Sequence, residues 1–184
     1  MKYLILIVAL GFASSSWAAQ PGLAFGENDR LDELFAEMQS VSGEGAAGAE
    51  REVLRIFRQS GSPAMDLLLE RGFVALEQED YEMGIWHFSA LIDHAPEFAE
   101  AYNARAAAYF MAGKYGEALA DIEMTLVLNP RHFGALAGMG TIQEELGHSD
   151  IALRAYKAAL ALSPHTQELI EAVKLIEDSL GMVH

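Results

Sequence analysis

Three prolines recur at one spacing in the second half of the chain, and this spacing constrains the fold more than any other feature. Pro96, Pro130 and Pro164 stand 34 residues apart. Units 65–98, 99–132 and 133–166, aligned on these prolines, carry residues of the same kind at the same positions. A period of this length is typical of helix-turn-helix repeats, which bury their apolar faces only by stacking on neighbouring copies. The spacing therefore predicts an all-α array of helical hairpins.

Large apolar residues and very small residues alternate along each unit. In chain order, repeat positions 4, 8, 20 and 24 hold Leu68, Tyr102 and Leu136; Gly72, Ala106 and Gly140; Gly84, Ala118 and Ala152; and Phe88, Ile122 and Tyr156. Because small residues let two helices approach closely, this pattern indicates tight packing of the two helices within each unit.

These positions resemble the tetratricopeptide repeat (TPR) family, and segment 101–119 of the second unit is the part most similar to it. The other units depart from the family pattern, since Ala75 and Gln143 replace the aromatic Tyr109 and Ser149 replaces Tyr115. The resemblance implies a TPR-type α-solenoid, a right-handed superhelix of helix hairpins, with TPR 1 at 65–98, TPR 2 at 99–132 and TPR 3 at 133–166. Such repeats carry no chemistry of their own, so no enzymatic activity and no cofactor are expected.

The first 18 residues have the pattern of a secretory signal peptide. Lys2 precedes a short apolar run, and Ser16-Trp17-Ala18 offers small residues for cleavage. The alternative, an uncleaved anchor, is disfavoured because the run is shorter than the roughly 20 residues that cross a bilayer. Without twin arginines or a cysteine, we expect export by the Sec route, no lipid anchor, and a periplasmic or secreted protein. Residues 19–28 are expected to be a flexible lead.

Two further helical segments flank the repeats. Apolar residues at helical spacing predict an N-terminal helical hairpin at 29–62, interpreted as a degenerate TPR-like repeat packed on TPR 1. Residues 166–181 predict a capping helix with Leu169, Val173, Ile176 and Leu180 on one face. Together these segments give about nine helices and no strand.

The charge balance restricts the partners. Lys2 is one of 12 Lys and Arg residues, so the chain without its first 18 residues has a formal charge of −16 against 27 acids. Such a balance argues against nucleic acid and against anionic membranes, and it favours a protein or peptide partner with basic and apolar residues. The alternative is that the charge only keeps a helical protein soluble.

The TPR resemblance implies that the first helix of each repeat lines a concave groove. The residues implied to face it are Asp66, Leu69, Glu70, Phe73, Glu77, Glu100, Asn103, Ala107, Phe110, Met111, Thr141, Glu144 and Glu145. They combine carboxylates with apolar anchors, and Asn103 could hold a peptide backbone. The alternative is that the apolar members are core and the carboxylates a solvated face.

One activity of the family is disfavoured by the residues. TPR domains that clamp the carboxylates of chaperone tails place cations and Asn at positions held here by Leu69, Phe73, Gly134 and Gly138. Without cations at those positions, an acidic tail would be repelled.

A structural ion pair is predicted between repeat positions 7 and 23. Arg71 and Arg105 occupy position 7, where an inward-facing cation needs a partner, and Asp121 occupies position 23 of TPR 2. We therefore expect a bridge between Arg105 and Asp121.

The histidines and carboxylates do not form a catalytic or metal-binding pattern. His87 and His94 are two helical turns apart, too far to share one ion unaided, and no HExxH spacing occurs. The sequence thus favours a non-enzymatic periplasmic adaptor or assembly factor that binds a partner segment in its groove. The alternatives are an accessory subunit of an envelope enzyme or of c-type cytochrome maturation, and a scaffold that forms homo-oligomers through its convex face or its N-terminal hairpin.

Overall fold

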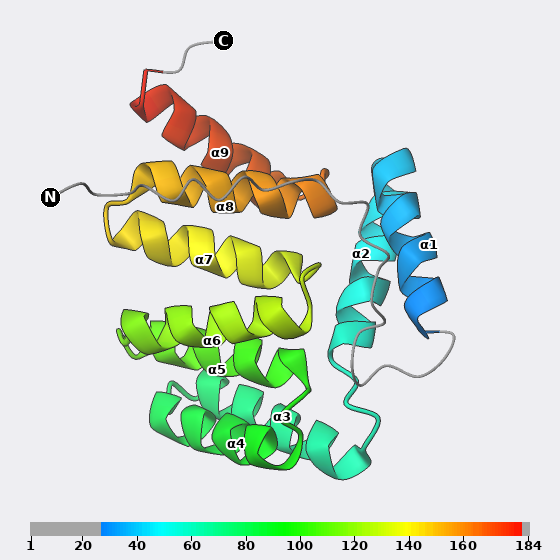
Figure 1. Ribbon diagram of the computed structural model, residues 1–184, viewed down its shortest axis with the longest axis vertical. Coiled ribbons are helices and arrows are strands. Elements are labelled where there is room, and N and C mark those ends of the chain that lie inside the picture. The colour runs from blue at the N-terminus through cyan, green and yellow to red at the C-terminus, as the bar shows by residue number, and fades with distance from the viewer. Residues whose placement is uncertain (1–26, 182–184) are drawn as a thin grey trace, which may run out of the picture.

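A computed structural model describes residues 27–181, and within this range every regular element is a helix (Figure 1). The predicted signal peptide and most of the predicted lead lie outside the described residues. The helices are α1 (Glu27–Ser40), α2 (Glu44–Phe57), α3 (Pro63–Glu77), α4 (Tyr81–His94), α5 (Ala99–Met111), α6 (Tyr115–Leu128), α7 (Phe133–Glu145), α8 (Ser149–Leu162) and α9 (Gln167–Ser179).

Six of these helices form three stacked hairpins, α3–α4, α5–α6 and α7–α8. Helices α3, α5 and α7 contact one another along the stack and so form its inner row. The turn inside each hairpin needs a residue of positive φ at repeat position 15, where Glu79 (59°), Gly113 (71°) and Gly147 (77°) stand. Glycine adopts this conformation without steric cost, whereas Glu79 adopts it against the preference of its side chain.

Close helix approach within a hairpin depends on glycine at repeat position 8. A Cβ atom added to Gly72 would lie 2.2 Å from Cε1 of Phe88, and one added to Gly140 would lie 2.4 Å from Cε1 of Tyr156. The ring at position 24 therefore occupies the space that a side chain at position 8 would need. TPR 2 combines Ala106 with the smaller Ile122 and buries both.

Helix α9 caps the stack by packing on α8. Leu169, Val173 and Ile176 are buried there, as the helical spacing predicted. Leu180 was expected on the same face but is 46% exposed. The expectation fails because α9 ends at Ser179 and Leu180 is its C-cap, where the helical spacing no longer applies.

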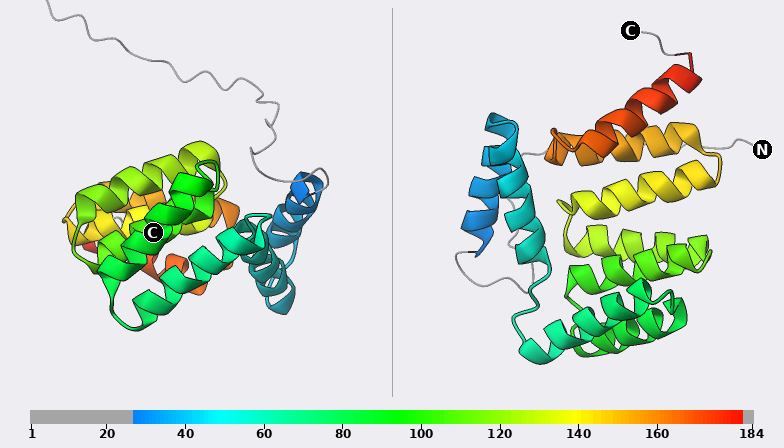
Figure 2. Two further views of the ribbon diagram at one scale, coloured as in Figure 1. Left: turned by 90° about the horizontal axis from the view of Figure 1, so that it is seen from below. Right: turned by 180° about the vertical axis from the view of Figure 1, so that it is seen from behind.

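The N-terminal hairpin α1–α2 does not stack on TPR 1, contrary to prediction. It stands beside the stack, along the edge where the chain passes from one repeat to the next (Figures 1 and 2). Its apolar stripe joins a core cluster that includes Phe133 of α7, Leu153 of α8 and Leu169 of α9. The hairpin thus buries its stripe against TPR 3 and the cap.

The linker after α2 holds the chain in a turn that accounts for this placement. Gly61 has a φ of 78°, and Ser60 donates from both N and Oγ to Oδ1 of Asp66, at 2.9 and 2.5 Å. Because α3 begins from this turn, it runs away from α2 instead of folding back on it (Figure 2).

Candidate binding surface

The structure distributes the predicted groove residues over three degrees of exposure. Glu70, Glu77, Met111, Thr141, Glu144 and Glu145 are exposed; Asp66, Phe73, Asn103, Ala107 and Phe110 are half-buried; Leu69 and Glu100 are buried. Leu69 belongs to the core cluster around Phe88 and Leu91, so its prediction as a groove residue is wrong. It packs inward because position 5 of α3 turns toward the helices that follow it in the stack.

Phe73 and Phe110 each have one side in the core and one side accessible. The Phe73 ring packs edge-on against Phe88 with 5.5 Å between centroids, and the guanidinium of Arg58 lies 5.1 Å above it. The Phe110 ring lies 5.7 Å from that of Tyr115. These two rings are therefore held in fixed orientations, as anchors for a partner would require.

Several predicted polar contacts to a partner are already used within the chain. Asp66 accepts from Ser60, and Asn103 donates through Nδ2 to Oε2 of Glu100 at 3.1 Å. Both side chains therefore serve first to position their neighbours, one in the linker and one at the start of α5.

Tyr156 engages two other predicted groove residues. Its hydroxyl lies 3.2 Å from Oγ1 of Thr141 and 3.0 Å from Oε2 of Glu144. Burial raises the pKa of Tyr156, so the hydroxyl keeps its proton and donates. This contact ties the end of α7 to α8.

Glu100 was predicted to face the groove and select positive charge, but it is a buried, paired carboxylate. Its Oε2 lies 2.9 Å from Nε2 of His132, and its Oε1 lies 3.7 Å from Nε of Arg58. Since the backbone N–H of Ala135 donates to Nδ1 of His132, the ring hydrogen is on Nε2 and points at Glu100. The docked hairpin closes this site, because Phe57 stacks on the His132 ring with 4.8 Å between centroids.

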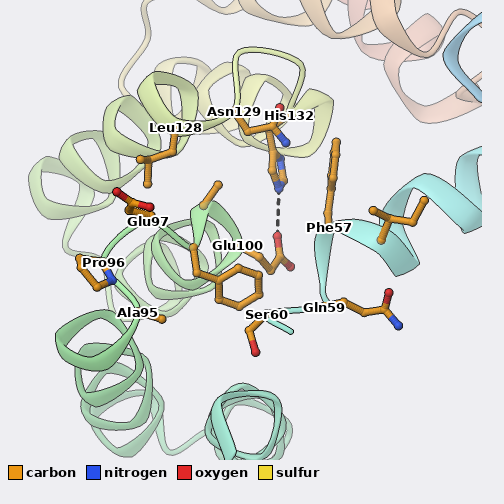
Figure 3. A pocket seen from close by; sticks show the side chains of 13 residues that line it. Phe57, Gln59, Ser60, Ala95, Pro96, Glu97, Glu100, Leu128, Asn129 and His132 are labelled. Carbon is orange, nitrogen blue, oxygen red and sulfur yellow. Dashed lines mark hydrogen bonds and ion pairs between the residues drawn. The ribbon is translucent and has the colours of Figure 1, made fainter. Parts of the chain in front are cut away.

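A pocket of about 300 Å³ lies beside this pair (Figure 3). Its walls come from the end of α2, the turn between α4 and α5, and the turn between α6 and α7. The lining residues are Ile56, Phe57, Gln59, Ser60, Ala95, Pro96, Glu97, Phe98, Ala99, Glu100, Leu128, Asn129 and His132. They include two carboxylates but neither Lys nor Arg, so the pocket suits an apolar group that ends in a hydrogen-bond donor or a cation.

Sequence reasoning found only Glu100 among the residues of this pocket. The pocket forms where α2 meets two inter-repeat turns, and the docking of α2 at that edge was not predicted. A usable signal was present in His132, a histidine at a repeat junction beside Asn129 and directly before an aromatic residue, Phe133.

The predicted partner of Arg105 is the one it has in the structure. Its Nε donates to Oδ2 of Asp121 at 2.7 Å and its Nη2 to Oδ1 at 2.8 Å, while Nη1 donates to Ser89 at 3.0 Å. Hydrogen bonding to Asp121 raises the pKa of Arg105 above its ordinary value. Arg71, at the same repeat position, was expected to face inward but is exposed, because no helix precedes α3 in the stack.

Neither a metal site nor a membrane span emerges from residues 27–181. Within that range, no three His, Asp or Glu side chains gather in a way that could hold a metal ion. None of the helices described there is long and apolar enough to cross a membrane.

Comparison with known proteins identifies the family. The tetratricopeptide repeat model matches residues 99–132, the second repeat. A TPR repeat-containing protein of Rhizobium etli is 30% identical over 153 residues, which cover 83% of this chain and 75% of that protein. The chain therefore belongs to the TPR family. Members of this class are typically interaction modules rather than enzymes, and the chain is a protein-interaction adaptor of that general kind.

Other relatives share only part of their length or only their fold. Hsp70-Hsp90 organizing protein 1 of Glycine max is 30% identical over 105 residues, but these make up 18% of that protein. The first TPR of Spaghetti (RPAP3), bound to the HSP90 peptide SRMEEVD, superposes with a TM-score of 0.61 and 25% identity, covering 64% of this chain and 93% of that one. MamA superposes with a TM-score of 0.60 and 21% identity, covering 86% of each chain, which is a likeness of fold alone.

Proposed function

We propose that the chain is an exported adaptor that binds a partner segment carrying basic and apolar residues. The segment lies along α3, α5 and α7, with Phe73, Phe110 and Met111 as apolar contacts and Glu70, Glu77 and Glu145 opposite its cations. One apolar side chain of the segment enters the pocket beside Glu100. The relatives whose structures contain a bound peptide support a peptide as the partner.

The pocket is the observation that carries this proposal. It combines an apolar wall from Phe57, Phe98 and Leu128 with the carboxylates of Glu97 and Glu100, and its lining has no Lys or Arg. A side chain with an apolar stem and a cationic end would bury the stem and pair the end. An acidic group would meet carboxylates at the same place.

The proposed partner differs in charge from the peptide of the RPAP3 complex, SRMEEVD. In this chain Leu69 is buried, Phe73 packs on Phe88, and positions 2 and 6 of TPR 3 are Gly134 and Gly138. None of these side chains can donate a charged hydrogen bond to a carboxylate. We therefore expect this chain to discriminate against acidic tails.

Fluorescence anisotropy with two labelled peptides tests the proposal. The probes are SRMEEVD and the same peptide with its three acidic residues replaced by lysine. We expect the lysine peptide to bind at least about tenfold more tightly, and to weaken as salt screens the carboxylates. Equal binding of the two peptides, or tighter binding of SRMEEVD, would contradict the proposal.

Matched variants separate the two parts of the surface. Phe73→Ala with Phe110→Ala removes the anchors of the inner row, and Ala99→Trp fills the pocket. Ala120→Trp is the control, because Ala120 is an exposed alanine of α6 outside the pocket. We expect both test variants to weaken the lysine peptide and the control to leave it unchanged. If all three variants bind the peptide as wild type does, the partner binds elsewhere.

A further inference from the structure

One face of α3 is exposed although the equivalent face of every later first helix is buried. Repeat positions 3 and 10 hold Ala101 and Ala108 in α5, both 0% exposed, and Ala135 and Ile142 in α7, at 0% and 2%. In α9 the same spacing gives Leu169 and Ile176, at 6% and 3%. In α3 it gives Leu67 and Val74, which are 50% and 40% exposed.

The cause is the position of the N-terminal hairpin. Helices α5, α7 and α9 cover these positions by packing on α4, α6 and α8, respectively. Helix α3 has no such predecessor, because α1 and α2 bury their apolar stripe against TPR 3 and α9. Solenoids need a polar outer face at each end, yet this end presents Leu and Val at the positions used for stacking.

The charges on this face are complementary to themselves. Glu70 and Arg71 are exposed and lie between Leu67 and Val74 on the helix. The four side chains fall within about 100° of helical arc, so they form one stripe along α3. A two-fold axis between Glu70 and Arg71 brings Leu67 of one copy opposite Val74 of the other. The same axis brings each Glu70 opposite an Arg71.

We propose that this stripe of α3 binds the same stripe of a second copy, in an antiparallel pair. Such an isologous contact is the commonest way for identical chains to associate, because one patch satisfies both partners. The contact would cover the apolar residues that the hairpin leaves open and would place two oppositely charged pairs at its centre. It is independent of peptide binding along the inner row.

Sedimentation velocity of the purified protein over a concentration series tests this proposal. We expect a dimer that Leu67→Asp weakens at least tenfold, while Val127→Asp leaves it unchanged. Val127 is the matched control, because it is an apolar residue on α6 with 74% exposure. Circular dichroism of both variants establishes that each is folded.

Charge reversal makes the test specific for the two-fold arrangement. Arg71→Glu places like charges opposite one another and is expected to weaken the dimer, whereas Glu70→Arg combined with Arg71→Glu restores opposite charges and the dimer. A protein that stays monomeric at high concentration would overturn the proposal. A dimer equally sensitive to Val127→Asp, or one that the double reversal fails to restore, would also overturn it.

Discussion

The three repeats solve the same packing problem with different pairs of side chains. At positions 8 and 24 the pairs are a glycine with a ring in TPR 1 and TPR 3, and Ala106 with Ile122 in TPR 2. Because each repeat keeps the same backbone, the volume gained at one position must be given up at the other. One repeat therefore predicts which double substitution another will accept.

We expect Gly72→Ala to destabilise the protein by about 1–3 kcal/mol, since the new methyl group would overlap the Phe88 ring. Adding Phe88→Ile, which copies TPR 2, should recover part of this loss. Urea unfolding measures both changes. Gly116→Ala is the control, because a Cβ at Gly116 meets nothing within 4 Å and alanine favours helix. A loss for Gly72→Ala no larger than for the control would refute the overlap.

The pair of Arg105 and Asp121 permits a second comparison between repeats. We expect Asp121→Ala to lower the free energy of unfolding by about 3 kcal/mol, because it leaves Arg105 without its carboxylate. Combining it with Arg105→Met copies Met139 and Ala155 of TPR 3 and should cost less than the sum of the single changes. A double-mutant cycle with strictly additive losses would exclude the coupling.

Residue-level prediction succeeded where both partners belong to one repeat and failed where the partner came from outside it. Arg105 and Asp121 are fixed by the positions they share with equivalent repeats. Glu100 was expected in solvent because the family pattern describes only the stack, whereas His132 and the docked Phe57 enclose it.

At the scale of elements, the N-terminal hairpin is the part with its own docking energetics. Three contacts hold it: Phe57 stacks on His132, Arg131 pairs with Asp32, and the Arg131 guanidinium lies 4.7 Å over the Phe35 ring. The length of both helices followed from apolar spacing. Their docking place did not, because an amphipathic stripe specifies that it must be buried but not against which surface.

We expect Phe57→Ala to release α1 and α2 while the repeats stay folded. The substitution removes a buried ring that contacts His132 and Phe133, at a cost of about 3–5 kcal/mol. Hydrogen exchange measured by mass spectrometry should show protection lost in α1 and α2 and kept in α5 and α6. An equal loss of protection in α5 and α6 would show that the hairpin and the stack unfold together.

At the scale of the whole molecule, the 34-residue period was sufficient to predict the all-α superhelix and its cap. The period fixes which faces meet, since each repeat contacts only its neighbours. Export is a prediction of a different kind, because it depends on a segment that is read before folding.

Expression of the full chain in a bacterium with Sec export tests that prediction. We expect N-terminal sequencing of the protein released from the periplasm to begin at Ala19, after the small residues at Ser16 and Ala18. Protein retained in the cytoplasm with Met1 intact would contradict it.

The burial of α9 on α8 limits how large an assembly of this chain can grow. With that terminus of the array already covered, identical molecules meeting through α3 would complete a closed pair and have no equivalent surface left for a third. Sickle-type fibres require a patch and its receptor at different places on one molecule, whereas here the patch is its own receptor. Growth beyond two copies is thus prevented by the placement of a single helix.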